Sequence, residues 1–501
     1  MVDEGECGDG AGRSVEDLIN EAASLAKQDL YRQARRLLEE AVKLAPDNAR
    51  AWEQLGYVLG LLEEYDNAEE AMRRSLEIEP ENPHLWLTLA TTLLVKGDGA
   101  GAEQACREAI RLDPLRARAW ALLGKILVND ERYAEAEEAL EKALEIDPAN
   151  AQAWMNLGTA RFELGKEEEA LAALDRAYQI NPTHRDIIGT RGYLLGKMGD
   201  HKGAEEMYRA IVELEPDNVA AWQSLAFSLE QQKKNEELAK AMETALEYNP
   251  DAGVLWAFLS AARMGLGDAA GAYETASKAV ELTPDDAFAW KQLAQALDSM
   301  GRREEAINAL EKALSLKPDI SPYWYLLGTW KWQERDIVGA EEAFRHVTQL
   351  DPAYHGGWYG LGAALDLQGR IREAEEAFLK YLERRPDDKR IWYNVGQFRL
   401  QMYRFGEAKE AFSRVLEIDP DNTFAMMCKA FCVAIEGDLK QAAELLRRTL
   451  ELDPELLEAE HCLALVLLKG GDRSELKPAY ERLAGTEPSS MRDLIMLAIL
   501  A

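Results

Sequence analysis

The chain has 501 residues, of which 47% are hydrophobic and 30% are charged, and its formal net charge is −32 at pH 7. A chain this acidic repels nucleic-acid phosphates and anionic lipid headgroups, so we expect neither nucleic acid nor a membrane as its partner. It contains no run of 18 apolar residues and no apolar signal sequence near Met1, which leaves the cytoplasm as the expected location.

Residues 1–14 are rich in glycine and acidic side chains and are expected to form a disordered tail. From Val15 onwards a 34-residue repeat is marked by 14 of the 17 prolines. Proline lacks a backbone N–H and clashes with the preceding turn, so each one ends a helix at the same point of the repeat. These prolines are Pro46, Pro80, Pro114, Pro148, Pro182, Pro216, Pro250, Pro284, Pro318, Pro352, Pro386, Pro420, Pro454 and Pro488.

Residues 15–490 divide into fourteen repeat units without insertion or deletion, and residues 491–501 follow as half a unit that predicts one more helix. Positions within a unit are numbered so that its proline is at position 32. The units are 15–48, 49–82, 83–116, 117–150, 151–184, 185–218, 219–252, 253–286, 287–320, 321–354, 355–388, 389–422, 423–456 and 457–490.

Each unit predicts two helices, because apolar residues at positions 4, 7, 8 and 11, and again at 20, 24, 27 and 28, share one helical face. Small residues at position 8 allow the two helices to approach closely. The most regular examples are tryptophan at position 4 (Trp52, Trp120, Trp154, Trp222, Trp290, Trp358, Trp392) and glycine at position 8 (Gly56, Gly124, Gly158, Gly362, Gly396). A single helical hairpin cannot bury its apolar face, so the units must stack into an all-α solenoid.

The run Trp120-Ala-Leu-Leu123-Gly124, with Ala136, Leu140, Ala143 and Pro148 behind it, resembles the tetratricopeptide repeat. The resemblance covers residues 15–490. It implies a right-handed superhelix in which positions 2, 5, 6, 9, 12 and 13 of the first helices line a concave groove. It also implies that the groove binds a peptide or a helix of another protein.

Aromatic side chains gather at the expected groove positions of units 10 to 13 and predict a partner-binding surface there. The predicted residues are Tyr325, Trp332, Tyr359, Tyr393, Phe424, Met427 and Phe431. The alternative is that tyrosine at position 5 is simply typical of the family. A second and sparser set at position 9 consists of Tyr57, Tyr193 and Phe227.

Two irregular regions leave alternatives open. Units 6 and 7 have Ile188 at the tryptophan position and Leu238 at a position where alanine is usual, which suggests either a local bend or tolerated drift. Residues 491–501 are apolar nearly all round. They fit self-association with another chain, a natural chain that continues, or a frayed end.

No motif predicts a catalytic, cofactor or metal site. The glycines of Gly97-Asp-Gly-Ala-Gly-Ala102 have dinucleotide-loop spacing but follow a helix instead of a strand. Cys428, Cys432, His461 and Cys462 suggest either a zinc or redox site or cysteines packed between helices. Chaperone-binding members of the family use a clamp with lysine at position 5 and asparagine at position 9, and no three consecutive units here carry it.

Every residue from 15 to 490 has a position in the repeat, so no segment remains for a catalytic domain. The sequence therefore predicts a non-catalytic scaffold for protein partners. The alternative is the interaction arm of a larger enzyme or regulatory complex.

Overall fold

The structure is a computed structural model that describes residues 13–470. This part of the chain folds into 27 α-helices and contains no strand. It divides into two compact units, Met1–Leu266 and Gly267–Ala501. Residues 1–12 of the predicted tail, the end of the last repeat and the predicted helix at 491–501 lie outside the described residues.

The first compact unit holds α1 to α15. Their bounds are α1 Val15–Ala26, α2 Tyr31–Leu44, α3 Ala49–Leu61, α4 Tyr65–Ile78, α5 Pro83–Lys96, α6 Gly99–Leu112, α7 Ala117–Asn129, α8 Tyr133–Ile146, α9 Ala151–Glu163, α10 Glu167–Ile180, α11 Arg185–Lys197, α12 His201–Leu214, α13 Val219–Gln231, α14 Asn235–Tyr248 and α15 Gly253–Gly265.

The second compact unit holds α16 to α27. Their bounds are α16 Ala269–Leu282, α17 Ala287–Ser299, α18 Arg303–Leu316, α19 Ser321–Gln333, α20 Ile337–Leu350, α21 His355–Leu367, α22 Ile371–Leu382, α23 Lys389–Gln401, α24 Phe405–Ile418, α25 Thr423–Ile435, α26 Leu439–Leu452 and α27 Leu457–Gly470.

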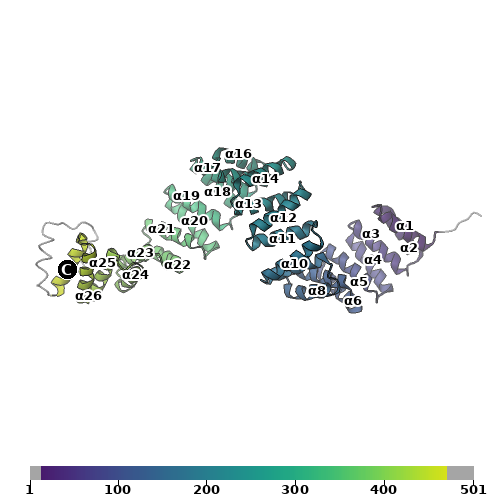
Figure 1. Cartoon of the computed structure of the whole chain (residues 1–501), viewed down its shortest axis with the longest axis horizontal. Helices are drawn as coiled ribbons and strands as arrows, with labels where there is room; N and C mark the ends of the chain where they lie inside the picture. The colour runs from purple at the N-terminus through teal and green to yellow at the C-terminus, as the bar shows by residue number, and fades with distance from the viewer. Residues whose placement is uncertain (1–12, 471–501) are drawn as a thin grey trace, which may run out of the picture. The chain divides into compact units, whose positions relative to one another are not determined.

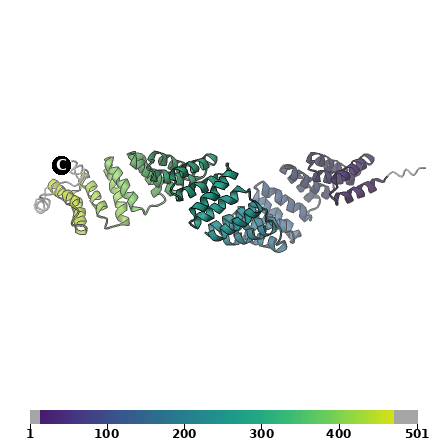
Figure 2. The same cartoon turned by 90° about the horizontal axis from the view of Figure 1, so that it is seen from above.

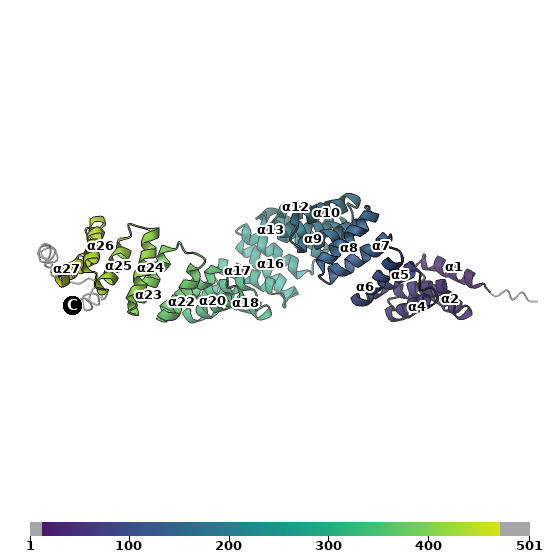
Figure 3. The ribbon, with the colours of Figure 1, turned by 90° about the horizontal axis from the view of Figure 1, so that it is seen from below.

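Within each compact unit every helix packs on the helix before it and the helix after it (Figure 1). The same chain-order pairing is visible from above in Figure 2 and from below in Figure 3. The predicted all-α solenoid of tandem helix pairs is therefore confirmed.

The seam between successive repeats is closed by one hydrogen bond that recurs ten times. The indole Nε1–H of the tryptophan at position 4 donates to the carbonyl oxygen of the proline six residues earlier, at 2.7 to 3.0 Å. The donors are Trp52, Trp86, Trp120, Trp154, Trp222, Trp256, Trp290, Trp324, Trp358 and Trp392. Each bond supplies a donor to a carbonyl oxygen just past a helix end, where backbone carbonyls have no donor within the helix.

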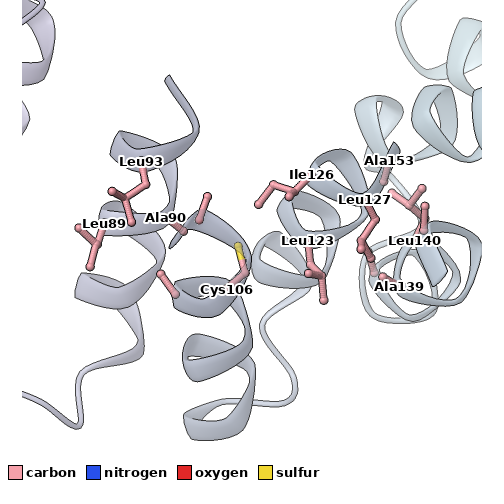
Figure 4. Close-up of a cluster of buried hydrophobic side chains, with 14 of the residues drawn as sticks. Leu89, Ala90, Leu93, Cys106, Leu123, Ile126, Leu127, Ala139, Leu140 and Ala153 are labelled. Atoms are coloured by element: carbon pink, nitrogen blue, oxygen red, sulfur yellow. The ribbon is translucent and has the colours of Figure 1, made fainter. Parts of the chain in front are cut away.

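The core lies between paired helices, where small side chains face large ones. Figure 4 shows Leu123 and Leu127 of α7 beside Leu140 of α8, all nearly inaccessible to solvent. In the second compact unit, glycine at position 8 faces phenylalanine at position 24. A Cβ added to Gly396 would lie 2.7 Å from the Phe412 ring. The helices can approach this closely only because position 8 has no side chain.

Each glycine at position 15 between residues 13 and 470 adopts a left-handed backbone conformation at the hairpin turn, as Gly97 does at φ 92°. Unit 7 makes the same turn without glycine, because Lys233 adopts φ 56°. Leu238, the other irregular residue of that unit, is buried at 1% exposure. The helices of units 6 and 7 begin and end at the same repeat positions as their neighbours, so these residues do not change helix length.

Charged side chains also join successive repeats. A glutamate at position 21 accepts hydrogen bonds from the basic residue at position 16 of the next unit at five joints. The pairs are Glu103 with Arg132, Glu137 with Lys166, Glu205 with Lys234, Glu341 with Arg370 and Glu375 with Arg404. At the last three joints the glutamate side chain is between 5% and 9% exposed, so the charge is desolvated and depends on its partners.

Replacing Gly396 by alanine should destabilise the α23–α24 pair. Overpacking against Phe412, which is fully buried, costs about 1–3 kcal/mol. That exceeds the ~1 kcal/mol that alanine gains over glycine within a helix. Hydrogen exchange of α23 and α24 should therefore be faster in the variant.

The matched control for this substitution is Gly189→Ala in the middle of α11, where the nearest atom to the new Cβ lies at an ordinary 3.7 Å. That variant should be slightly stabilised. Unchanged exchange of α23 in Gly396→Ala would show that position 8 does not set the helix approach.

Glu341→Gln should destabilise the joint between units 10 and 11 at neutral pH. Burial acts to raise the pKa of Glu341. Hydrogen bonds from Gln368, Arg345 and Arg370 outweigh burial and hold that pKa below its ordinary value of 4.5. The ionised carboxylate therefore adds stability above pH 4.5, which is lost as the pH falls through its lowered pKa.

We expect Glu341→Gln to lower the free energy of unfolding by roughly 1–3 kcal/mol at pH 7 and to flatten its dependence on pH in the acid range. Chemical unfolding followed by circular dichroism across this range gives the measurement. Glu376→Gln on the exposed face of α22 is the control and should behave like the wild type.

Candidate binding surfaces

The structure exposes two of the seven aromatic or apolar side chains predicted to contact a partner. Tyr359 of α21 is 44% exposed and Phe424 of α25 is 50% exposed. Tyr325, Trp332 and Tyr393 are half-buried and pack against the core with part of each ring. These five side chains can still contact a ligand.

Met427 and Phe431 are corrections to the sequence prediction. They are only 2% and 4% exposed, because both side chains belong to the core that α25 forms with its neighbours. Their repeat positions, 5 and 9, are exposed elsewhere, as Tyr359 and Tyr57 are. Position in the repeat alone therefore does not decide burial, and these two residues serve packing.

Tyr325 and Tyr359 are joined to rings that the sequence prediction missed. The ring of Tyr354 meets Tyr325 edge-on at 5.1 Å between centroids, and Tyr381 lies 5.6 Å from Tyr359. His355 lies between them, 5.7 Å from Tyr354 and 5.9 Å from Tyr381. We call Tyr325, Tyr354, Tyr359 and Tyr381 the tyrosine cluster.

Tyr381 is fixed by a polar contact at its far end. It is 8% exposed, and its hydroxyl donates a hydrogen bond to Asp388 at 3.0 Å. Burial acts to raise the pKa of Asp388, but hydrogen bonds from Tyr381 and Arg390 hold it below its usual range. Asp388 also caps α23 by accepting from the backbone N–H of Arg390. The cluster is thus anchored to a helix end.

One signal in the sequence points to Tyr381. It occupies position 27, where seven of the fourteen units have alanine and no other unit has an aromatic residue, and Arg384 replaces the apolar residue usual at position 30. The second helix of this unit, α22, ends at Leu382, two residues earlier in the repeat than its counterparts. A large ring in place of alanine and an early helix end both mark this unit as specialised.

The sparser set at position 9 is half exposed. Tyr57 is 52% exposed, and Tyr193 and Phe227 are each 50% exposed. The ammonium of Lys197 lies 5.5 Å from the centre of the Tyr193 ring, a cation–π contact. These rings belong to the first compact unit.

The described cysteines are packed inside the helices. Cys106, Cys428, Cys432 and Cys462 are all buried. Between residues 13 and 470, no group of three histidine, cysteine or acidic side chains is placed to hold a metal ion. Over the same residues, no helix is both long and apolar enough to cross a membrane.

Profiles of known families match large parts of the chain. One described as tetratricopeptide repeat matches residues 263–329 and 331–397, and a second with the same description matches 186–218 and 389–422. The profile of the cilia and flagella-associated protein 70 C-terminal domain matches residues 4–195. No curated protein matches the chain.

Solved structures of helical-repeat proteins are similar over different lengths. The Cut9–Hcn1 hetero-tetramer of APC/C is 18% identical, with 91% of this chain and 97% of that chain covered and a TM-score of 0.36. PilF of Pseudomonas aeruginosa is 20% identical over 42% of this chain and 95% of its own, with a TM-score of 0.38. YrrB is described as a repeat protein with an unusual peptide-binding site. It is 26% identical over 35% of this chain and 90% of its own, with a TM-score of 0.31.

The buried cysteines should not react with thiol reagents in the folded protein. Burial raises the pKa of Cys106 and of Cys432 to about 12, so almost no thiolate is present at neutral pH. The test uses a Cys7→Ser background, which leaves the four buried cysteines. Ellman's reagent should release little thionitrobenzoate from the native protein. After unfolding in guanidinium it should release four equivalents per chain. Rapid native labelling would contradict the packing and reopen the redox alternative.

Proposed function

The chain belongs to the tetratricopeptide-repeat family, and we propose that it is a non-catalytic scaffold that holds a segment of another protein against its tyrosine cluster. Proteins of this family typically mediate protein–protein interaction. The expected ligand is an extended peptide or a partner helix that lies along α19, α21 and α23. Its main contacts would be the exposed ring of Tyr359 and, further along the chain, that of Phe424.

The exposure of Tyr359 is the observation that carries this proposal. A tyrosine ring supplies a large contact area, loses few rotamers on binding and keeps a hydroxyl for hydrogen bonding. Its neighbour Tyr381 is buried and held by Asp388, so the Tyr359 ring rests on a fixed support before any ligand arrives. Such preorganisation reduces the entropy lost on binding.

The repeat supports a scaffold because it offers similar helices side by side over a long stretch of chain. Contacts to successive helices add up within one ligand and give avidity without a single deep pocket. The half-buried rings of Tyr325, Trp332 and Tyr393 would contribute such secondary contacts. The continuous array of residues 15–490 also leaves no inserted segment for a catalytic domain.

The interaction arm of a larger enzyme or regulatory complex is the alternative proposal. It is favoured by the apolar sequence of residues 491–501, where Ile495, Met496 and Ile499 suit contact with another chain. The same segment would serve self-association. In either case the tyrosine cluster keeps its proposed role.

Tyr359→Ala combined with Phe424→Ala should abolish most ligand binding without unfolding the protein. Both side chains are about half exposed, whereas Tyr325 and Tyr393 also pack on Phe344 and Phe412 and would report on stability as well. Peptides selected from a random display library on the wild-type chain provide the ligands, and fluorescence anisotropy gives their Kd.

Loss of hot-spot aromatic residues should weaken binding about 30-fold or more. The control is Tyr403→Ala, which removes a ring that is 68% exposed at the turn between α23 and α24. It should bind as the wild type does. If the double variant kept wild-type affinity for every selected peptide, the tyrosine cluster would not be the binding surface.

A further inference from the structure

A second candidate site lies in the first compact unit, whereas the tyrosine cluster belongs to the second. A cavity of about 300 Å³ opens across α3, α5 and α7, the first helices of units 2 to 4. Its polar lining includes Glu53, Gln54, Tyr57, His84, Thr88 and Arg118. These residues occupy repeat positions 2, 5, 6 and 9, so the cavity follows the same face of the first helices of three successive units.

Glu53 is a largely buried carboxylate whose ion pair is with a histidine instead of an arginine or a lysine. Its side chain is 16% exposed, and the ion pair it makes is with His84, at 3.2 Å from the imidazole Nε2. The imidazole itself is 57% exposed and carries a charge only when protonated. Arg50 also acts on Glu53, but its guanidinium forms an ion pair with Glu16 at 2.6 Å.

The electrostatics agree with this geometry. Burial raises the pKa of Glu53, and Glu79 raises it further, while His84 and Arg50 act to lower it without cancelling the effect. A carboxylate in this state gains from an added cation, because the new charge offsets its lost hydration. The glutamates at position 21 lack this property, since basic side chains of the next repeat already pair with them.

We propose that this cavity binds the guanidinium group of an arginine from a partner protein. The carboxylate of Glu53 accepts its paired N–H groups, and the ring of Tyr57, one helical turn further along α3, offers a face on which the planar group stacks. Arginine fits both features better than lysine, because its fork matches a carboxylate and its plane stacks on aromatic rings. Tyr57 is 52% exposed and therefore accessible.

Arg118 sets a limit on the ligand. It lines the same cavity as Glu53, so a second cation next to the bound one would be repelled. The expected ligand is therefore a single arginine flanked by neutral or acidic residues, not a polybasic run. Glu53 stands at position 5, where the chaperone-binding clamp described above has lysine. A lysine there binds an anionic group, whereas Glu53 would bind a cationic one.

The net charge of −32 favours approach of a cationic segment from solution. That attraction is shared by the whole surface and does not select arginine over lysine. Selectivity for the guanidinium must come from Glu53 and Tyr57. The site does not depend on the tyrosine cluster, and either proposal can fail without the other.

The test uses the full chain at physiological salt and three blocked tripeptides, acetyl-Gly-Xaa-Gly-amide with arginine, lysine or citrulline at the centre. Citrulline has the shape of arginine without its charge. Saturation-transfer NMR, which detects weak ligands, should give a signal for the arginine peptide at least about fivefold above the citrulline peptide, with lysine between them.

Glu53→Gln should reduce the arginine signal to the citrulline level. The matched control is Glu163→Gln, which removes an exposed carboxylate of α9 in the same compact unit and should leave the signal unchanged. Tyr57→Ser, at an exposed position, should weaken arginine binding about two- to fivefold, as expected for an exposed cation–π contact.

Equal signals from the arginine and citrulline peptides in the wild type would overturn the proposal, and this comparison needs no variant. Arginine binding that survives Glu53→Gln, or falls equally in Glu163→Gln, would also overturn it, since attraction to the acidic surface as a whole would explain the signal. Circular dichroism of each variant establishes that the helices are intact.

Discussion

The hydrogen bond from the tryptophan indole to the proline carbonyl is the constraint that sets ten of the joints between the described repeats. Proline ends the second helix of a unit and leaves its own carbonyl facing the next unit. The indole at position 4 satisfies that carbonyl and covers the seam with its ring, at Trp120 and Pro114 as at nine other joints. One contact therefore fixes both where a helix stops and how the next one starts.

Because the joints are regular, charged side chains of one unit can form ion pairs with those of the next. The position-21 glutamates exemplify this, because Glu205 and Glu375 are nearly buried and each forms an ion pair with a basic side chain of the following unit. Many lysine and arginine side chains form these ion pairs between units or form ion pairs within one helix. The positions of lysine and arginine in the sequence therefore do not by themselves mark a binding surface. A largely buried carboxylate whose ion pair is with a histidine, as at Glu53, is more informative.

Helix bounds and the core at positions 8 and 24 could be predicted from sequence, because proline, tryptophan and glycine leave few backbone alternatives at their positions. Side-chain exposure could not be predicted as well. Met427 has the same repeat position as Tyr359, yet one is 2% exposed and the other 44%, since burial depends on the residues of neighbouring helices. Tyr381 was missed for a related reason. Its position is most often a core alanine, so the repeat pattern marks the ring as unusual but does not show that it supports a surface tyrosine.

The two candidate sites follow from the same constraint. Glu53 and Tyr359 both occupy position 5 of a first helix, and the helices that carry them, α3 and α21, are both 13 residues long. Their joints are also alike, with Trp52 and Trp358 each 3.0 Å from the proline carbonyl. Because the backbone is held by the joint, position 5 is free to change from a ring to a carboxylate without altering the helix pair. A repeat built in this way can carry an aromatic surface at one point and an anionic cavity at another, and a partner is then selected by the order of its own side chains.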